Sequence, residues 1–387
     1  MVVIKKVSAK HVLDSSKEKT IFVLIDTNVG RFFSSSPTGK STGKFEAKPY
    51  KKDLEKDIET LKKFSDYFSN ESIENFYDLR RIEDTVDGHV GANTIFALES
   101  AVLKALAKEK KKEVWEIINF NATKRKKFPR LVGNCVGGGK HSKGKKPDFQ
   151  EFLLISKANS VKESFEILKK AKKELIYLLK KKDENFSSKK NSEDAWETSL
   201  NEKEILDILK IFKLPLGLDI AASSFYKRKK YSYFNPLLQR TKDEQFSYIS
   251  NILKNFGLFY IEDPFEEEDF ESFAQLTKKF PDSLIVGDDL TATNYKRVEK
   301  AISLKSINAL IVKPNQNGSL IEVNRICQLA KKNNIAIVFS HRSGETEEDI
   351  IADLAFGFQA DFLKCGITGK ERESKIKRLI EIEKKLK

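Results

Sequence analysis

The chain has 387 residues and a formal net charge of +14. Its length exceeds one small domain, and it allows two or three domains or one small domain attached to a barrel of roughly 250 residues. No apolar run approaches the roughly 20 residues of a membrane span, and the apolar stretch near the start is too short for a signal peptide. Three cysteines without close spacing predict neither a disulfide framework nor a thiolate zinc site. We therefore expect a cytoplasmic protein with no membrane partner.

The first part of the chain predicts a small α+β domain. Strand-like runs at 20–27 and 30–36 precede a loop rich in serine and glycine. The segment 92–119 then places apolar residues at the spacing of an amphipathic helix. We expect an N-terminal domain at 1–120 and a larger second domain at 121–387.

The second domain repeats one unit from residue 216 onward. Each unit has a short apolar run, a charged residue at its end, a turn and a helical pattern. The runs are "LGLD", "LFYIED", "LIVGDD", "ALIVK", "IAIVFSH" and "DFLK". Apolar runs that alternate with helices predict a parallel sheet covered by helices. Together with the earlier runs "RLVGNCV" and "QEFLLI", they favour a closed barrel over an open sheet.

Two lysine-rich segments precede these units. In 168–182 the lysines alternate with apolar residues at helical spacing, which is typical of the solvated face of an amphipathic helix. No face combines aromatic and basic residues as base stacking requires, so no nucleic-acid partner is expected. The polar connection at 180–204 is too long for an ordinary loop, and it is either disordered or functional.

A charged residue or a histidine ends each of the six runs. The first three of these residues are acidic, and the next three are basic. In such barrels the carboxyl ends of the strands share one mouth, which holds the active site. Asp219, Glu262 and Asp288 end three consecutive runs and should converge there. Three close carboxylates repel one another unless a hard divalent cation holds them, and oxygen ligands favour Mg²⁺.

The next three runs end in Lys313, His341 and Lys364, which predicts a cationic wall. Such walls suit an anionic substrate from which a poorly acidic proton must be removed beside metal charge. Lysine can be the base if its pKa is lowered, and desolvation together with the ammonium of Lys364 would lower it. Beside His341, Arg342 provides a guanidinium and Ser343 a hydroxyl, and both groups suit a phosphate.

At these residues the sequence resembles the enolase family. The match runs through "GLDIAASSFY", "YIEDPFEEEDF", "VGDDLTATN", "IVKPNQNGS" and "SHRSGETEEDIIADLAFG", and upstream through "GANTIFALESAVLKALAKE" and "GGGKHSKGKKPDFQEFLLI". The resemblance implies an α/β fold, with an N-terminal α+β domain packed on a modified (β/α)₈ barrel. It also implies reversible dehydration of 2-phospho-D-glycerate to phosphoenolpyruvate in glycolysis and gluconeogenesis, two Mg²⁺ ions, and a dimer or an assembly of dimers.

The resemblance assigns roles to the charged residues. Asp219, Glu262 and Asp288 correspond to the ligands of the first Mg²⁺, and Ser41 to a ligand of the second. Lys313 corresponds to the base that removes the C2 proton. Lys364 corresponds to the residue that holds the substrate carboxylate and depresses the pKa of the base.

The remaining matches concern the phosphate and the leaving hydroxyl. Arg342 and Ser343, next to His341, resemble the phosphate clamp. His141, Gln150 and Glu151 match polar residues around the leaving hydroxyl.

The acid that protonates this hydroxyl is a glutamate in the family, and here the segment reads "NSEDAWETS". Alignment on Ala195 and Trp196 selects Glu193, whereas an alignment that ignores the tryptophan selects Asp194. Asp194 also stands where the family has glycine, which removes the backbone freedom of that glycine.

Three other functions compete with an active enolase. "TGKSTGK" contains half of a P-loop, but Ser34 occupies the place of the first glycine and no strand-loop-helix frame follows. An impaired enolase-like protein could act as a basic binding module for RNA or another polyanion. A different dehydratase of the superfamily would not need the phosphate clamp.

Overall fold

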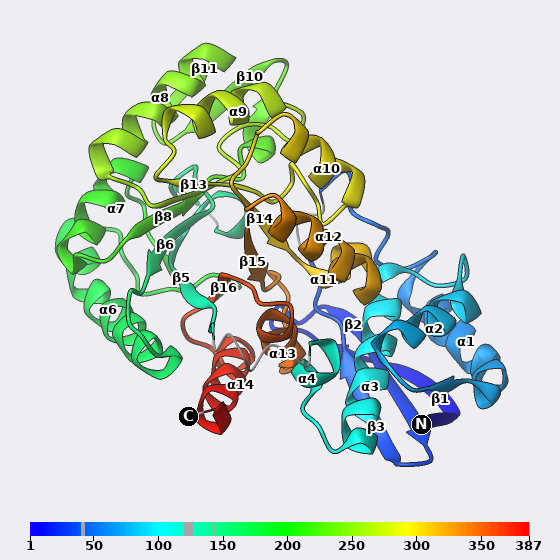
Figure 1. The fold of residues 1–387 in the computed structure, drawn as a ribbon. Helices are drawn as coiled ribbons and strands as arrows, with labels where there is room; N and C mark the ends of the chain where they lie inside the picture. Colours follow the sequence, from blue (N-terminus) through cyan, green and yellow to red (C-terminus); the bar gives the residue numbers. More distant parts are fainter. Residues whose placement is uncertain (40–42, 120–126, 143, 387) are drawn as a thin grey trace.

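The computed structural model describes residues 1–39, 43–119, 127–142 and 144–386. Within these residues, eight strands close into a barrel, because β16 pairs with β5. Figure 1 shows the strands in a ring that is surrounded by helices. In barrel order they are β5 (Arg130–Gly137), β6 (Glu151–Ile155), β8 (Leu216–Asp219), β12 (Tyr260–Glu262), β13 (Leu284–Gly287), β14 (Ala309–Val312), β15 (Ala336–Ser340) and β16 (Phe362–Gly366). The predicted closed barrel is confirmed.

The strands are apolar because both of their faces are buried. All four residues of β14 are buried, as expected for a parallel strand between a barrel interior and covering helices. Side chains from alternate positions fill the interior as one cluster: Val132, Leu153, Ile155, Tyr260, Val286, Ala309, Ile311, Val338 and Phe362. The barrel is thus packed inside, which leaves its mouth as the place for a site.

One strand departs from the predicted parallel arrangement. β6 runs antiparallel to both β5 and β8, whereas the other barrel pairs are parallel. Among its described residues, the connection between β5 and β6 contains the 3₁₀ turn Gly139–His141 and no crossover helix, which a parallel pair would require. As a result, the beginning of β6 lies at the same end of the barrel as the carboxyl ends of its neighbours.

The helices that cover the barrel begin where the sequence provides caps. Asn294 accepts a hydrogen bond from the backbone of Arg297 at the start of α10, and Ser319 caps α12 in the same way. The covering helices are α6 (Val161–Lys182), α7 (Glu202–Leu209), α8 (Lys242–Phe256), α9 (Phe270–Lys279), α10 (Tyr295–Ser303), α12 (Leu320–Lys332), α13 (Ile350–Gly357) and α14 (Lys370–Leu386). Across the described part of the chain, no helix combines the length and the apolar character that crossing a membrane would need.

The N-terminal part forms a second, antiparallel sheet in the order β3-β2-β1-β4, drawn in blue in Figure 1. Its strands are β1 (Val2–Leu13), β2 (Lys19–Thr27), β3 (Gly30–Ser35) and β4 (Ser72–Ile73), and its helices are α1 (Leu54–Phe64), α2 (Leu79–Val86), α3 (Ala92–Lys110) and α4 (Val114–Ile118). Sequence analysis missed β1, whose alternation a bulge interrupts between Ile4 and Lys6.

The single helix predicted at 92–119 is wrong in one respect. It is broken at Lys111, whose φ of 53° is left-handed and ends α3 before α4 begins. The expected domain boundary at 120 lies outside the described residues.

The loop after β3 connects this sheet to the barrel mouth. Thr38 pairs with Gly344, which follows β15, through a backbone bridge. The amide of Asn315 donates to the carbonyl of Pro37 and to the side chain of Asn93, at 3.0 and 2.9 Å. The N-terminal part therefore contributes directly to the wall of the site.

Candidate active site

A cavity of about 170 Å³ lies at the barrel mouth. It is lined almost entirely by polar and charged side chains from the ends of barrel strands and from the loop after β3. The ionisable residues on its wall are Lys44, Lys140, Glu151, Glu193, Asp219, Asp263, Glu267, Asp288, Asp289, Lys313, His341, Arg342 and Lys364. A small cavity with this many ionisable groups of both signs has the character of an active site.

The barrel register places the three predicted carboxylates at the ends of three neighbouring strands. Asp219 is the last residue of β8 and is paired with Glu262, the last residue of β12. Asp288 follows β13, the next strand. On the other side of β8, the antiparallel β6 begins with Glu151, which is paired with Asp219, and Gln150 donates to Asp219 at 3.3 Å. The reversed direction of β6 therefore places Gln150 and Glu151 at the mouth.

Lys364 lies at the centre of these carboxylates. It is inside β16 rather than at its end, and its side chain is 2% exposed. Its ammonium contacts Asp219 at 2.8 Å, both oxygens of Glu262 at 2.8 and 2.9 Å, and Glu151 at 3.2 Å. Burial lowers the pKa of Lys364, but the three carboxylates outweigh it and raise this pKa well above its ordinary value. Lys364 is therefore charged.

Lys313 follows β14 and pairs with Asp288. Burial and the charges of Arg342 and Lys364 act to lower the pKa of Lys313, yet the contact with Asp288 outweighs them and raises it. The predicted depression of this pKa is therefore not found in this arrangement. Both lysines form ion pairs with carboxylates, so positive and negative groups are interspersed at the mouth and do not form two separate walls.

The carboxylates have the donor chemistry of a site for a hard divalent cation. Burial, and next the charge of Asp219, raises the pKa of Glu262 to about 8, so negative charge is crowded there. One oxygen of Asp288 is buried and has no hydrogen-bond partner within the described residues. Oxygen ligands, excess negative charge and an unsatisfied oxygen fit such an ion.

Asp263 also lies close to Asp288 and Asp289. Its two oxygens accept hydrogen bonds from the backbone amides of Asp288 and Asp289, at 3.0 and 2.6 Å. Its own φ of 42° is left-handed, a strained conformation for a non-glycine residue that is found at functional sites. Asp263 therefore positions the end of β13, a role that the sequence did not indicate.

Glu193 lies in a second cluster on the cavity wall, together with His341 and Glu151. Its carboxylate accepts a hydrogen bond from Asn134 at 2.9 Å and is 4.0 Å from His341. Burial, and next the charge of Glu193, raise the pKa of Glu151 well above its ordinary value, which favours the protonated form of Glu151. Burial also lowers the pKa of His341 well below its ordinary value, which makes the imidazole neutral.

Asp194 faces away from this cavity. Its carboxylate pairs with Lys172 at 3.0 Å and with Lys190 at 2.9 Å, and it accepts a hydrogen bond from Thr368. Its φ is 62°, the left-handed region that a glycine would favour, and these three contacts hold it there. The predicted choice between two acids thus corresponds to two side chains on opposite sides of one loop, of which Glu193 reaches the cavity. The polar connection at 180–204 is ordered here.

The expected phosphate-binding residues are buried side by side. Arg342 pairs with Glu46 at 2.8 Å and donates to Asn315, and Ser343 follows it on the cavity wall. Gly39 packs so closely on the Arg342 guanidinium that any side chain at position 39 would collide with it.

Arg372, to which the sequence assigned no role, donates hydrogen bonds to the backbone around Arg342 and Ser343. It is 1% exposed and donates to the carbonyls of Ser343, Arg342 and Ser192 at 2.9, 3.3 and 3.2 Å, and to the hydroxyl of Ser15 at 2.7 Å. One guanidinium therefore joins the expected phosphate clamp, the Glu193 loop and the N-terminal part.

Two predicted residues cannot be placed. Ser41 lies outside the described residues, although Gly39 and Gly43 on either side of it line the cavity. The backbone of His141 forms part of a 3₁₀ turn, but its side chain is outside the described part.

Comparison with known proteins agrees with this architecture. The family model described as "Enolase, C-terminal TIM barrel domain" matches residues 126–387. A protein named enolase from Methanosphaera stadtmanae is 33% identical, with 99% of this chain and 97% of that protein covered. The enolase of Methanothermobacter thermautotrophicus is 32% identical with the same coverage, and that of Pyrobaculum aerophilum is 39% identical over 66% of this chain and 64% of its own length. The chain therefore belongs to the enolase family of hydro-lyases.

Proposed function

We propose that this chain is a Mg²⁺-dependent enolase that interconverts 2-phospho-D-glycerate and phosphoenolpyruvate. One observation carries the proposal. A partly buried lysine, Lys313, and a buried glutamate, Glu193, line the same small cavity, together with oxygen ligands for a cation and Arg342 for a phosphate. Removal of a proton by one group and protonation of a leaving hydroxyl by another require this combination.

Asp219, Glu262 and Asp288 would hold the first Mg²⁺. When bound, the ion supplies positive charge next to the substrate carboxylate, where negative charge accumulates as the C2 proton leaves. Ser41 would contribute to a second Mg²⁺, as in the family resemblance.

Lys313 would remove the C2 proton. The charge of Asp288 is the main reason that the pKa of Lys313 stays high, while burial, Arg342 and Lys364 act in the opposite direction. The lysine therefore becomes a competent base when Asp288 is no longer its ion-pair partner. Lys364, charged and central, would hold the substrate carboxylate.

Glu193 would donate a proton to the leaving C3 hydroxyl. The raised pKa of Glu151 keeps a proton in the carboxyl next to Glu193, from which Glu193 would be supplied. Asn134 orients Glu193 through a hydrogen bond of 2.9 Å. Gln150 and His141 would complete the polar surroundings of the hydroxyl.

Arg342 and Ser343 would bind the phosphate, with His341 beside them. Neither ring nitrogen of His341 has a hydrogen-bond partner within the described residues, so the neutral imidazole can donate to a substrate oxygen. We further propose a homo-oligomer, a dimer or an assembly of dimers, and a cytoplasmic location, both in line with the family resemblance.

The test is a direct assay on the purified full chain. With Mg²⁺ and 2-phosphoglycerate, we expect the ultraviolet absorbance of phosphoenolpyruvate to appear, and EDTA to abolish it. A properly folded, Mg²⁺-loaded protein without turnover would contradict the proposal, and retention of polyanions in its place would favour the basic binding module.

A further inference from the structure

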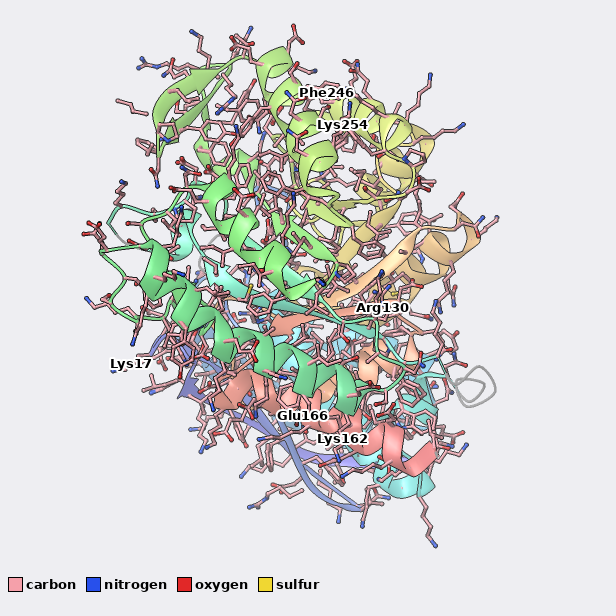
Figure 2. All side chains as sticks on the ribbon, turned by 90° about the vertical axis from the view of Figure 1, so that its left-hand side faces the viewer. Lys17, Arg130, Lys162, Glu166, Phe246 and Lys254 are labelled. Carbon is pink, nitrogen blue, oxygen red and sulfur yellow. The ribbon has the colours of Figure 1, made fainter. Side chains whose placement is uncertain are left out.

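A second cavity lies outside the barrel, on the exposed side of the loop that carries Glu193. Its volume is about 450 Å³, within the range of small-molecule sites. The residues that line it are Glu166, Lys169, Lys170, Lys172, Lys173, Lys190, Trp196 and Thr368, and we call it the α6 cavity. Figure 2 looks onto α6, with Glu166 labelled on its outer surface.

The charge of the α6 cavity is strongly positive. Five lysines line it against one glutamate, and Asp194 is the carboxylate that two of these lysines contact. Within the described part of the chain, Lys169 and Lys173 form no ion pair, and Lys170 reaches Glu174 only at 4.0 Å. The ammonium of Lys169 lies over the ring of Phe165, 4.9 Å from its centre, which leaves its charge uncompensated. Lys169, Lys170 and Lys173 can therefore neutralise an anion with more than one negative charge.

An aromatic wall distinguishes this cavity from a plain patch of lysines. The indole of Trp196 is fixed by a hydrogen bond of 3.0 Å from its nitrogen to the carbonyl of Lys172, and by the edge of Phe186. The ammonium of Lys190 lies 5.1 Å from the centre of the indole ring. A fixed indole beside cations suits a flat ring attached to a charged group.

We propose that the α6 cavity binds a nucleotide, with its phosphates on the lysines of α6 and its base against Trp196. Glu166, at the rim, would accept hydrogen bonds from the ribose hydroxyls. The volume exceeds what inorganic phosphate alone would fill, and the indole has no partner in such an anion.

The cavity is coupled to the Glu193 loop through shared lysines. Lys172 and Lys190 line it and also hold Asp194, the residue after Glu193. A phosphate that draws Lys190 away would weaken one of the contacts that keep Asp194 in its left-handed conformation. This consequence for activity rests on the proposed role of Glu193, whereas binding itself does not.

The test is calorimetric titration of the full chain with ADP in EDTA, with pyrophosphate and adenosine as comparison probes. We expect ADP to bind more tightly than either, and Lys173→Glu to weaken it by about tenfold, as one lost phosphate contact implies. Lys180→Glu is the matched control, since it makes the same charge change on the same helix outside the cavity. We expect it to leave the affinity nearly unchanged.

Three outcomes would overturn the proposal: no heat with ADP, equal weakening by the two charge reversals, or equal affinity for ADP and pyrophosphate. Trp196 provides an independent signal, because the chain has two tryptophans and the other, Trp115, is 2% exposed. ADP should quench the fluorescence of the wild type but not that of Trp196→Phe. Because no step involves 2-phosphoglycerate, these results are independent of whether the chain proves to be an active enolase.

Discussion

The contact between Asp194 and Lys172 offers a quantitative test of how the loop next to the cavity is held. We consider Asp194→Asn, which removes the charge but keeps the size and the tolerance of asparagine for the left-handed region. Lys172 is 2% exposed, and Asp194 is its carboxylate partner. Breaking a buried ion pair from one side costs about 3–5 kcal/mol. Because the Asp194 side chain is one-quarter exposed and asparagine still accepts a hydrogen bond, we expect a loss of about 2 kcal/mol.

The second variant, Lys172→Met, should behave differently. Burial is the main cause that lowers the pKa of Lys172, from 10.5 to about 8, so keeping it charged at pH 7 costs about 3 kcal/mol. Methionine removes both this cost and the ion pair, so its net effect should be within about 1 kcal/mol. In the double variant the loss caused by Asp194→Asn should nearly disappear, which gives a coupling energy of about 2 kcal/mol.

The assay is equilibrium unfolding in urea at pH 7 and at pH 9.5. Between the folded pKa of about 8 and the unfolded pKa of 10.5, the unfolded chain binds more protons at Lys172, so the contribution of this group to stability rises with pH. The penalty of Asp194→Asn should therefore be smaller at pH 9.5, where Lys172 is mostly neutral in the folded chain. Equal losses with and without Lys172→Met, or at the two pH values, would refute this reasoning.

Two further variants test other parts of the structure. Burial raises the pKa of Glu202 to about 7. Between pH 4.5 and 7 the folded chain therefore binds more protons at Glu202 than the unfolded chain, and stability falls as pH rises. Glu202→Gln should stabilise the chain at pH 8, by up to about 3 kcal/mol, and not at pH 4. Thermal unfolding at the two pH values checks this, and an equal change at both would contradict it. In Arg372→Lys the lysine cannot reach four oxygens at once, so KM for 2-phosphoglycerate should rise by about tenfold. The control is Arg378→Lys, which changes an ion pair with Asp353 and Glu113 and should leave KM unchanged. Unaltered KM in a folded Arg372→Lys variant would exclude the positioning role.

The barrel could be predicted from the sequence because its strands are buried on both faces. Continuous apolar runs alternate with capped helices, and residues after the runs collect at one end for reasons of topology alone. The direction of β6 could not be predicted in this way, since a run of apolar residues does not indicate whether the strand is parallel or antiparallel to its neighbours. Only the absence of a helix between β5 and β6 could have indicated an antiparallel pair.

The sequence predicted that charged residues would gather at the barrel mouth, but not how they would be paired. Asp219 and Glu262 share the ammonium of Lys364, whereas the carboxylates grouped with Asp288 are those of Asp263 and Asp289. The pairing of Lys313 with Asp288 also reverses the expected direction of the pKa shift. Spacing along the chain does not show which of several charges is nearest to a given lysine. Arg372 was missed for a related reason, because it acts on backbone carbonyls, which carry no signal in the sequence.

The most direct test of the central claim is deuterium exchange at C2 of 2-phosphoglycerate, measured by NMR with Mg²⁺ present. We predict that Lys313→Ala abolishes this exchange. We predict that Glu193→Gln retains it while dehydration is slowed by at least about 10², as expected for loss of a general acid. Exchange that persists in Lys313→Ala, in a protein that still binds Mg²⁺, would contradict the assignment of Lys313 as the base.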